Sequence, residues 1–367
     1  PENVLLDRRD RVKVTDFGLA RPVTSHTRQT AVLATPAYVS PEHIRGDSTD
    51  GRSDVYSAGI LLYELVTGRT PYQGSGFVPG VVNNQFSIDE RAGIVRVATT
   101  RTTWADSNDD IGIAPDVWIP PTTDNLVSTL RLEEGELAVV GQTPGLAESE
   151  RIFSARFLGD VAYIVTFRQV DPLFAIDLSD PENPEVLGEL KIPGFSDYMH
   201  PLGENHLLTI GRDIDEQTQR DNGTALQIFD VSDPVQPKLA WKALVGEGYS
   251  EANHNHKAFN FYAGESPDAG LLAFPFVSYE GEFSSTLELW DVSAEDGFVR
   301  RGAVDHSDLV LEDCGAPYPV EEFYSYCGYE PQITRGVFID QYIYSISHGG
   351  IRVHSVADLT SVATARY

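Results

Sequence analysis

The sequence contains little cysteine, little lysine and no long hydrophobic run. Its 367 residues include two cysteines and five lysines, and the longest apolar run, around residues 59–66, is far shorter than the roughly 20 residues that span a bilayer. We therefore expect no membrane span in this chain. It begins at Pro1 without a methionine or a basic and apolar leader, and we expect the true N-terminus to lie upstream.

Positive charge is scarce and unevenly distributed. The chain carries 27 Lys and Arg against 55 Asp and Glu, a net charge of −28. Residues 1–76 contain nine of each sign, whereas residues 77–367 contain 18 cations and 46 acids. This asymmetry indicates two domains of different origin. The acidic part is expected to repel nucleic acid and anionic membranes.

The two cysteines are Cys314 and Cys327, in a stretch rich in Tyr, Pro and Gly. A local disulfide between them is expected if the domain is exported, and two free thiols if it is cytosolic. Neither cysteine has the spacing of a CxxC or metal motif.

The stretch from Arg151 to His200 contains four β-rich runs that predict one blade of a β-propeller. The predicted strands are residues 151–158, 161–167, 173–178 and 185–190, and Gly159-Asp160 suits a tight hairpin between the first two. The hairpin recurs as PLGENHLLTI, ESPDAGLLAF and VFIDQYIYSI, and the third strand FAIDLSDP recurs as LQIFDVSDP, LELWDVSAE and IRVHSVADL. A divergent earlier blade is predicted from residue 85 through 141. A period of this length is typical of propellers.

The predicted fold is therefore mainly β, a β-propeller preceded by a small α-rich segment. About five blades are visible, and we expect an incomplete ring. The second and third strands of each copy should supply the core between blades. The aligned positions Asp177, Asp230, Asp291 and Ser355 should close turns and have no catalytic role. Long loops at 100–124, after 200, 212–223, 263–269 and 305–333 are where a ligand is expected.

The opening PENVLLDRRDRVKVTDFGLARP resembles the serine/threonine protein kinase family from the catalytic loop onward. By this resemblance Asn3 and Asp16 are magnesium ligands, Asp16 being the first residue of the DFG motif. The resemblance also implies an activation segment over residues 19–39. Its phosphorylation candidates are Thr24, Ser25, Thr27, Thr30 and Thr35.

The stretch SDVYSAGILLYELVTGRTPY is similar to the long central helix of the kinase C-lobe. Ser53 is the expected N-cap and Gly68 the expected C-terminal cap, and a helix apolar nearly all round should be buried. The glycine-rich loop, the phosphate-binding lysine and the catalytic aspartate of the family are not in the sequence. We expect no phosphate transfer by this chain as it stands, no cofactor, and Mg-ATP only if a kinase N-lobe were supplied.

The predicted organisation is a truncated kinase C-lobe over 1–72, a linker over 73–76 and a propeller over 77–367. Residues 77–367 resemble a family of secreted proteins with a C-terminal β-propeller distantly related to WD repeats. The stretch from Glu150 to Gly203 and GGIRVHSVADL carry this resemblance. It implies a secreted or cell-envelope location, whereas the kinase-like segment implies a cytoplasmic one. The expected partner is a protein, peptide or glycan on the loop face.

Other chemistry is weakly indicated. His254 and His256 would share one face if extended and could bind a transition metal, although ordinary polar residues at a strand entry are the preferred interpretation. The acidic stretches 106–110 and 213–221 could hold calcium or form solvated loops. The leading hypothesis is a non-catalytic binding propeller with a kinase remnant. The alternatives are a fragment of a kinase with a propeller sensor, and a metal-dependent propeller enzyme.

Overall fold

The computed structural model describes residues 4–6, 12–14, 38, 40, 50–68, 71, 74–104, 121–167, 171–192, 194–215, 217–218, 220–280, 283–309 and 332–367. The chain divides into two compact units. The first consists of residues 1–77, 92–94 and 130–140, and the second of residues 78–91, 95–129 and 141–367.

The first unit contains the helix α2 (Gly51–Thr67) and a hairpin of β1 (Val4–Leu6) and β2 (Val12–Val14). Asp50 caps the helix, because its side chain accepts from the backbone N–H of Arg52 at 2.9 Å. The prediction that Ser53 is the N-cap is wrong, since Asp50 already occupies that position. The prediction for Gly68 is confirmed: its φ is +75°, and its N–H donates to the Glu64 carbonyl at 2.7 Å.

The prediction that this helix is buried is wrong. Val55, Leu65 and Val66 are 73%, 70% and 85% exposed, and among the helix residues only Ser53 and Ile60 are buried. Burial needs a partner surface, and none of the described residues covers this face of the helix. Within the described residues, no helix combines the length and apolar composition needed to cross a membrane.

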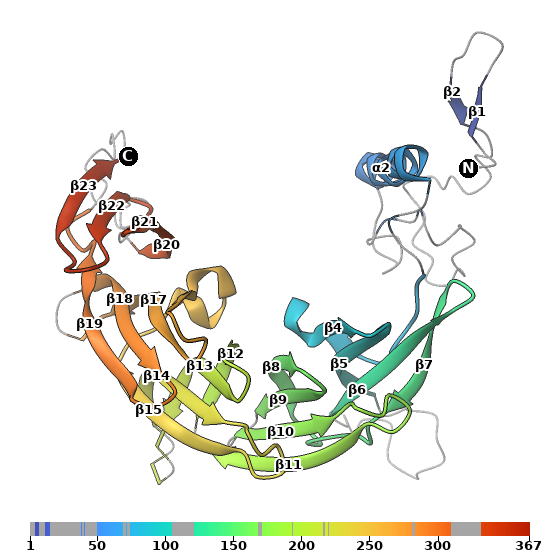
Figure 1. The fold of residues 1–367 in the computed structure, drawn as a ribbon, viewed down its shortest axis with the longest axis horizontal. Helices are drawn as coiled ribbons and strands as arrows, with labels where there is room; N and C mark the ends of the chain where they lie inside the picture. The colour runs from blue at the N-terminus through green and yellow to red at the C-terminus, as the bar shows by residue number, and fades with distance from the viewer. Residues whose placement is uncertain are drawn as a thin grey trace, which may run out of the picture. The chain divides into compact units, whose positions relative to one another are not determined.

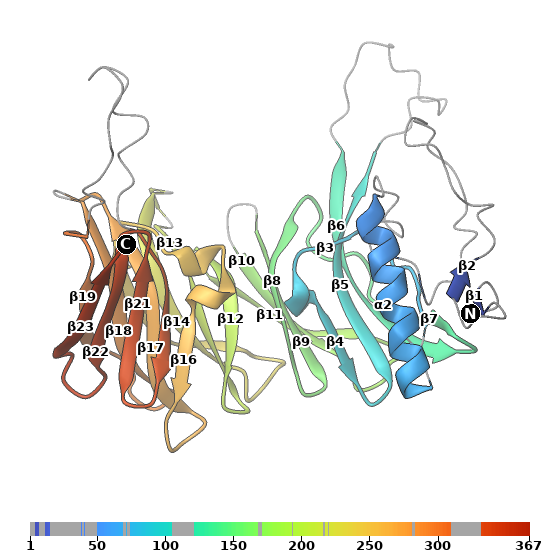
Figure 2. The ribbon, with the colours of Figure 1, turned by 90° about the horizontal axis from the view of Figure 1, so that it is seen from above.

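Four sheets of the second unit each contain four consecutive antiparallel strands (Figure 1). They are β8–β11 (Arg151–Leu158, Val161–Phe167, Asp171–Asp177, Glu185–Ile192), β12–β15 (Phe195–Leu202, His206–Ile214, Asp221–Asp230, Lys238–Gly246), β16–β19 (Asn260–Ala263, Ala269–Ser278, Ser284–Ser293, Gly297–Asp305) and β20–β23 (Ile333–Ile339, Tyr342–Ser347, Gly350–Ser355, Ser361–Arg366). Figure 2 shows the strands of each sheet lying side by side. The predicted repeat is confirmed as a propeller blade.

The reference blade matches the sequence prediction closely. Its first two strands have the predicted bounds, and Gly159 adopts a φ of +60° in the hairpin between them. A left-handed conformation of this kind favours glycine, which has no Cβ to clash. The third strand begins at Asp171, two residues earlier than predicted, and the fourth extends to Ile192.

The divergent earlier blade is also confirmed. Its sheet has the order β3 (Val81–Val82), β5 (Ile94–Thr103), β6 (Thr122–Glu133), β7 (Glu136–Gln142), and β4 (Ile88–Arg91) pairs with β5. Each described sheet of the propeller uses strands that are consecutive in the chain. No described blade therefore combines strands from both ends of the sequence.

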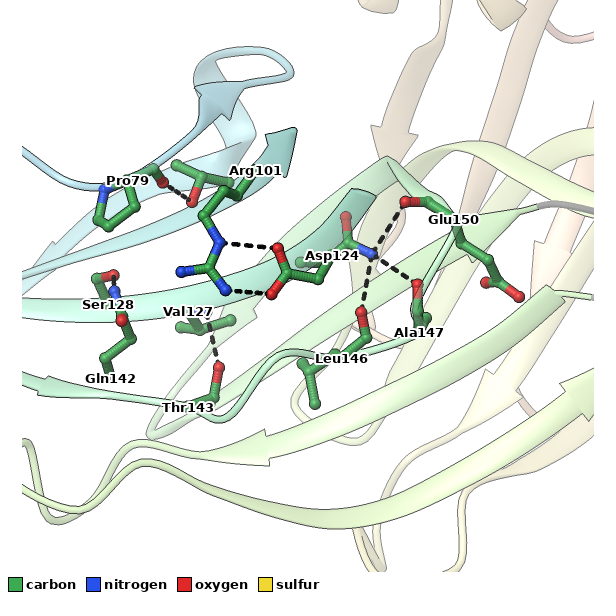
Figure 3. A network of polar contacts seen from close by, with 12 residues as sticks. Pro79, Arg101, Asp124, Val127, Ser128, Gln142, Thr143, Leu146, Ala147 and Glu150 are labelled. Atoms are coloured by element: carbon green, nitrogen blue, oxygen red, sulfur yellow. Dashed lines mark hydrogen bonds and ion pairs between the residues drawn. The ribbon is translucent and has the colours of Figure 1, made fainter. Parts of the chain in front are cut away.

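A polar network ties the earlier blade to the chain that leads into the next one (Figure 3). Asn125 is fully buried, and its Nδ2 atom lies 3.1 Å from the carbonyl oxygen of Leu146 and 3.4 Å from that of Glu150. Its Oδ1 atom accepts from the Thr100 hydroxyl, which in turn accepts from the backbone N–H of Ile152 in β8. Both ends of one amide are satisfied, so the network fixes where β8 begins.

Apolar side chains of the second and third strands fill the space between neighbouring blades, as predicted. Leu208 and Ile228 of one sheet pack in one cluster with Leu272 and Phe274 of the next, and all four side chains are fully buried. Burial of a side chain of this size contributes about 1.5–3 kcal/mol relative to exposure. Stacking of successive blades therefore contributes to the stability of this unit.

Of the four aligned residues at the ends of the third strands, Asp177 and Asp230 close turns through their side chains. The Asp177 carboxylate accepts from the Ser179 N–H at 2.8 Å, and that of Asp230 accepts from the Ser232 N–H at 2.9 Å. This confirms the prediction for these two residues. Asp291 instead forms an ion pair with Arg301. In this copy the Ser293 hydroxyl accepts from the backbone N–H groups of Glu295 and Asp296.

Candidate ligand-binding site

A cavity of about 610 Å³ lies among the first strands of two neighbouring blades in the second unit. This volume is in the range of small-molecule sites. Its wall is formed by β8, β12, the start of η3 (Gln85–Ser87), the end of β13, and the segment that contains η4 (Glu251–Asn253) and η5 (His256–Ala258). The lining residues are Asn83, Asn84, Phe86, Arg151, Ile152, Phe153, Phe195, Asp197, Tyr198, Arg212, Tyr249, Ala252, Asn253, His254 and His256.

Side-chain contacts hold β8 against β12. The Ser154 hydroxyl donates to the Ser196 carbonyl at 2.6 Å, and the Phe153 and Phe195 rings are 5.4 Å apart. Asn83 donates to the Phe153 carbonyl at 2.6 Å. The cavity wall is therefore fixed by bonds between blades and does not depend on a long surface loop.

Among the described lining residues, Asp197 is the only carboxylate. Its Oδ2 atom accepts from Asn253 Nδ2 at 2.6 Å. Burial raises the pKa of Asp197 from its ordinary value of 3.8 to about 6, although the Asn253 hydrogen bond and the charges of His254 and Arg212 act to lower it. A carboxyl with this pKa changes charge in the mildly acidic range.

A capping box places Asn253. The Ser250 hydroxyl accepts from the Ala252 N–H, and the Ser250 N–H donates to Asn253 Oδ1 at 3.0 Å. The Ser250 hydroxyl also donates to the Pro275 carbonyl of the next blade. The turn that carries Asn253 is thus anchored on both sides, which leaves its Nδ2 atom directed at Asp197.

The two lining arginines differ in their partners. Arg212 donates from Nε and Nη2 to Asp221 at 3.0 and 2.6 Å, and from Nη1 to the Gly248 carbonyl at 2.5 Å. Arg151 is exposed and has no ion-pair or hydrogen-bond partner for its side chain within the described ranges. One guanidinium is therefore structural, and the other is available.

A further arginine, Arg156, packs against two of the aromatic rings that line the cavity. The Arg156 guanidinium stacks over the Phe86 ring at 4.1 Å from its centroid and over Tyr198 at 5.3 Å, and it donates to the Met199 carbonyl. Burial lowers the pKa of Arg156 and raises that of Tyr198. Burial also lowers the pKa of the neighbouring His200 to about 4, so this imidazole stays neutral.

The segment that carries His254 and His256 is not extended, contrary to the geometry that the metal hypothesis required. It forms two 3-10 turns, and His256 Nε2 lies 2.9 Å from Gln85 Nε2 while its ring meets Phe86 edge-on. Both histidines line the cavity. Within the described ranges, no group of three or more His, Cys, Asp or Glu could hold a metal ion. Metal binding by this pair stays an untested prediction.

The three described acidic residues in the stretch 213–221 have separate partners, and Glu216 lies outside the described residues. Asp213 pairs with Lys242 and accepts from Asn222, Asp215 accepts from the Thr218 N–H at 2.6 Å, and Asp221 pairs with Arg212. The Thr218 hydrogen bonds lower the pKa of Asp215. These carboxylates stabilise the end of the β13–β14 hairpin.

Several predicted site residues lie outside the described residues. They are Asn3, Asp16, Thr24, Ser25, Thr27, Thr30, Thr35, Cys314, Cys327 and the acidic stretch 106–110.

Sequence reasoning missed Asp197 and Arg151 because it searched the long loops, and it did not single out Arg212, which begins the predicted loop 212–223. The cavity instead uses first strands and the connection between β15 and β16. The available signal was Asp197 itself, a carboxylate within a strand whose neighbours Ser196 and Met199 are buried. A charge in such a place needs a partner or a function.

Comparison with known proteins agrees with the fold. The chain is 42% identical over 187 residues to an uncharacterized protein of Archaeoglobus fulgidus. The aligned region covers 51% of this chain and 26% of that protein. An uncharacterized protein of Methanocaldococcus jannaschii is 39% identical over 185 residues, with 50% and 26% coverage. The chain thus matches about a quarter of the length of these relatives.

A second kind of relative is the serine/threonine-protein kinase PknB of Mycobacterium leprae. It is 51% identical over 77 residues, or 20% of this chain and 12% of the kinase. The chain therefore contains a short kinase-like segment. The sequence profile described as "Beta propeller domain" matches residues 13–359, nearly the whole chain. With five sheets of propeller type in the structure, the chain belongs to the β-propeller domain family.

Proposed function

We propose that this chain is a non-catalytic binding protein that holds its ligand in the cavity between β8 and β12. The observation that carries this proposal is the arrangement of Asp197. One of its oxygens is held by Asn253, and the other has no protein partner within the described ranges. A carboxylate that is positioned but only half satisfied is typical of a binding site.

The same arrangement argues for binding over hydrolysis. General acid–base and glycosidic chemistry commonly uses two carboxylates of different pKa, and the described lining has only Asp197. A nucleophile oriented by a base is not among the lining residues described for this cavity either.

The kinase-like segment offers a second candidate function, phosphate transfer by a longer protein. Its support is the 51% identity to a kinase over 77 residues. The sequence contains the DFG motif at 16–18 but no glycine-rich loop or phosphate-binding lysine. Positioning of the nucleotide provides most of the catalysis in kinases, so the segment alone should not bind Mg-ATP.

Two measurements on the full chain distinguish these functions. Isothermal titration with Mg-ATP should give no saturable heat, and saturable binding would contradict the proposal for the kinase-like segment. Sequencing the DNA directly upstream of the Pro1 codon tests the longer kinase. An in-frame catalytic-loop aspartate and an N-lobe lysine would support it.

The metal-dependent enzyme has a separate test. Elemental analysis of the purified chain, before and after dialysis against zinc, should show no stoichiometric metal retained by His254 and His256. One retained metal ion per chain that is lost in His254→Ala would favour the enzyme hypothesis instead.

A further inference from the structure

The lining of the cavity lacks the acidic excess of the whole chain. The sequence carries about twice as many acids as cations, yet the described lining contains two arginines against one aspartate. Asp221 neutralises Arg212, which leaves Arg151 as a guanidinium with no protein partner in the described ranges. A free guanidinium presents a planar fork of donors that matches a carboxylate.

The remaining polar atoms of the cavity include both donors and acceptors. Asn83 uses its Nδ2 atom on Phe153 and keeps Oδ1, whereas Asn84 uses Oδ1 on the Phe86 N–H and keeps Nδ2. Asp197 keeps Oδ1. Among these described side chains, neither donors nor acceptors predominate. Hydroxyl groups suit such a set because each can donate and accept at once.

Aromatic rings provide the apolar part of the wall. Phe86, Phe153, Phe195, Tyr198 and Tyr249 all line the cavity. The Tyr249 hydroxyl accepts from Gln332 at 2.7 Å, which fixes this ring at the edge of the site. Rings with polar neighbours bind ligands that are apolar on one face and polar at the rim, and a pyranose ring has this character.

A bound peptide strand fits the cavity less well. Peptides commonly bind by pairing their backbone with a sheet edge. Here the facing edges of β8 and β12 already have partners. Side chains of Asn83, Ser154 and Arg156 occupy the carbonyls of Phe153, Ser196 and Met199.

We propose that the cavity binds an acidic saccharide, with the sugar carboxylate on Arg151, hydroxyl groups on Asp197, Asn83 and Asn84, and a ring face against the aromatic wall. This inference rests on the proposed binding function of the same cavity and names the ligand class. It requires recognition of two features together, a carboxylate and a set of hydroxyl groups.

Isothermal titration of the full chain at pH 7.5 with trigalacturonate tests the ligand class. Maltotriose, which lacks the carboxylates, and trialanine, which has a carboxylate without hydroxyl groups, are the comparison probes. We expect trigalacturonate to bind at least tenfold more tightly than either. Equal binding of trialanine, or no binding of trigalacturonate, would overturn the acidic-saccharide inference.

Two variants locate the site. Arg151→Gln should lower the affinity for trigalacturonate at least tenfold, and the control Arg335→Gln, in β20 and outside the cavity lining, should leave it unchanged. Equal loss in both variants would show non-specific attraction to positive charge and would contradict the assignment of Arg151. Thermal unfolding of both variants checks that the fold is intact.

A separate readout tests the binding function itself. His254 is exposed at the cavity, so His254→Trp should fill its mouth without disturbing the core. The wild-type chain and this variant are applied to a mixed array of saccharides, peptides and organic acids. A ligand of another class that is lost in the variant would retain the binding function while the saccharide inference fails. No ligand lost in the variant would overturn the binding function as well.

Discussion

Asn253 Nδ2 donates to Asp197 Oδ2 over 2.6 Å and joins residues 56 positions apart in the sequence. Asp197 belongs to the first strand of one blade, and Asn253 belongs to the turn that leads into the next blade. This hydrogen bond therefore depends both on how the two blades stack and on whether the Asp197 carboxyl is protonated. This coupling makes the stability of the second unit depend on pH.

Replacement of Asp197 by Asn should stabilise the chain above pH 6. Burial raises the pKa of Asp197 from 3.8 to about 6, so the folded state binds this proton more tightly than the unfolded state does. The stabilisation by protonation is complete below pH 3.8 and is lost as the pH rises to 6 and beyond. Urea unfolding at pH 7.5 should show Asp197→Asn more stable by up to about 3 kcal/mol.

The control for this prediction is Asp340→Asn. Asp340 is exposed and has a φ of +51°, a conformation that asparagine tolerates. At this exposed position the replacement should change the free energy of unfolding at pH 7.5 by less than about 0.5 kcal/mol. If the stability difference between wild type and Asp197→Asn does not change with pH, the carboxyl is not buried as the structure has it.

Replacement of Asn125 by Ala should destabilise the earlier blade. The variant leaves the Thr100 hydroxyl without its acceptor in a buried place, whereas the Leu146 carbonyl keeps its bond from the backbone N–H of residue 125. An unsatisfied buried group costs about 1–3 kcal/mol. Urea unfolding followed by tryptophan fluorescence should show a loss of about 1–3 kcal/mol.

Asn183→Ala is the matched comparison for Asn125. Asn183 donates to Asp180 at 2.8 Å in an exposed turn. Its replacement should change the free energy of unfolding by less than about 0.5 kcal/mol. Similar losses in both variants would show that burial of the Asn125 amide contributes nothing specific.

The blade architecture could be predicted from the sequence because each hairpin repeats a local pattern. Gly159-Asp160 between two β-rich runs is sufficient to fix the first hairpin, and the structure reproduces its strand bounds. The cavity could not be predicted in this way. It depends on Arg151, Asp197 and Asn253, which come from three elements, and nothing in their local sequence shows which strands become neighbours.

The local sequence also gave a wrong prediction for the burial of α2. The apolar residues Val55 and Val66 predict burial, but burial requires a partner surface, and none of the described residues covers these side chains. The helix ends, in contrast, depend on nearby residues only. Gly68 was therefore predicted correctly, and the error at Ser53 amounts to three positions, because Asp50 is an equally good cap.

Replacement of Gly159 should separate the effect of backbone conformation from that of packing. A Cβ at this position would meet no atom within 4 Å, so any cost arises from its φ of +60°. Gly159→Val should destabilise the chain by about 1–2 kcal/mol. Gly159→Asn should cost clearly less, because asparagine tolerates the left-handed region. The same loss in both variants in urea would indicate a steric cause that the structure does not contain.

The exposure of α2 predicts an uneven response to substitution along the helix. Val66 is 85% exposed, so Val66→Gln should leave amide hydrogen exchange over residues 51–67 unchanged. Ile60 is 7% exposed, and Ile60→Ala should accelerate exchange across the whole helix, since loss of a buried isoleucine side chain costs about 2–5 kcal/mol. Mass spectrometry of peptides from this segment measures both. Faster exchange in Val66→Gln than in Ile60→Ala would show that the other face of the helix is the packed one.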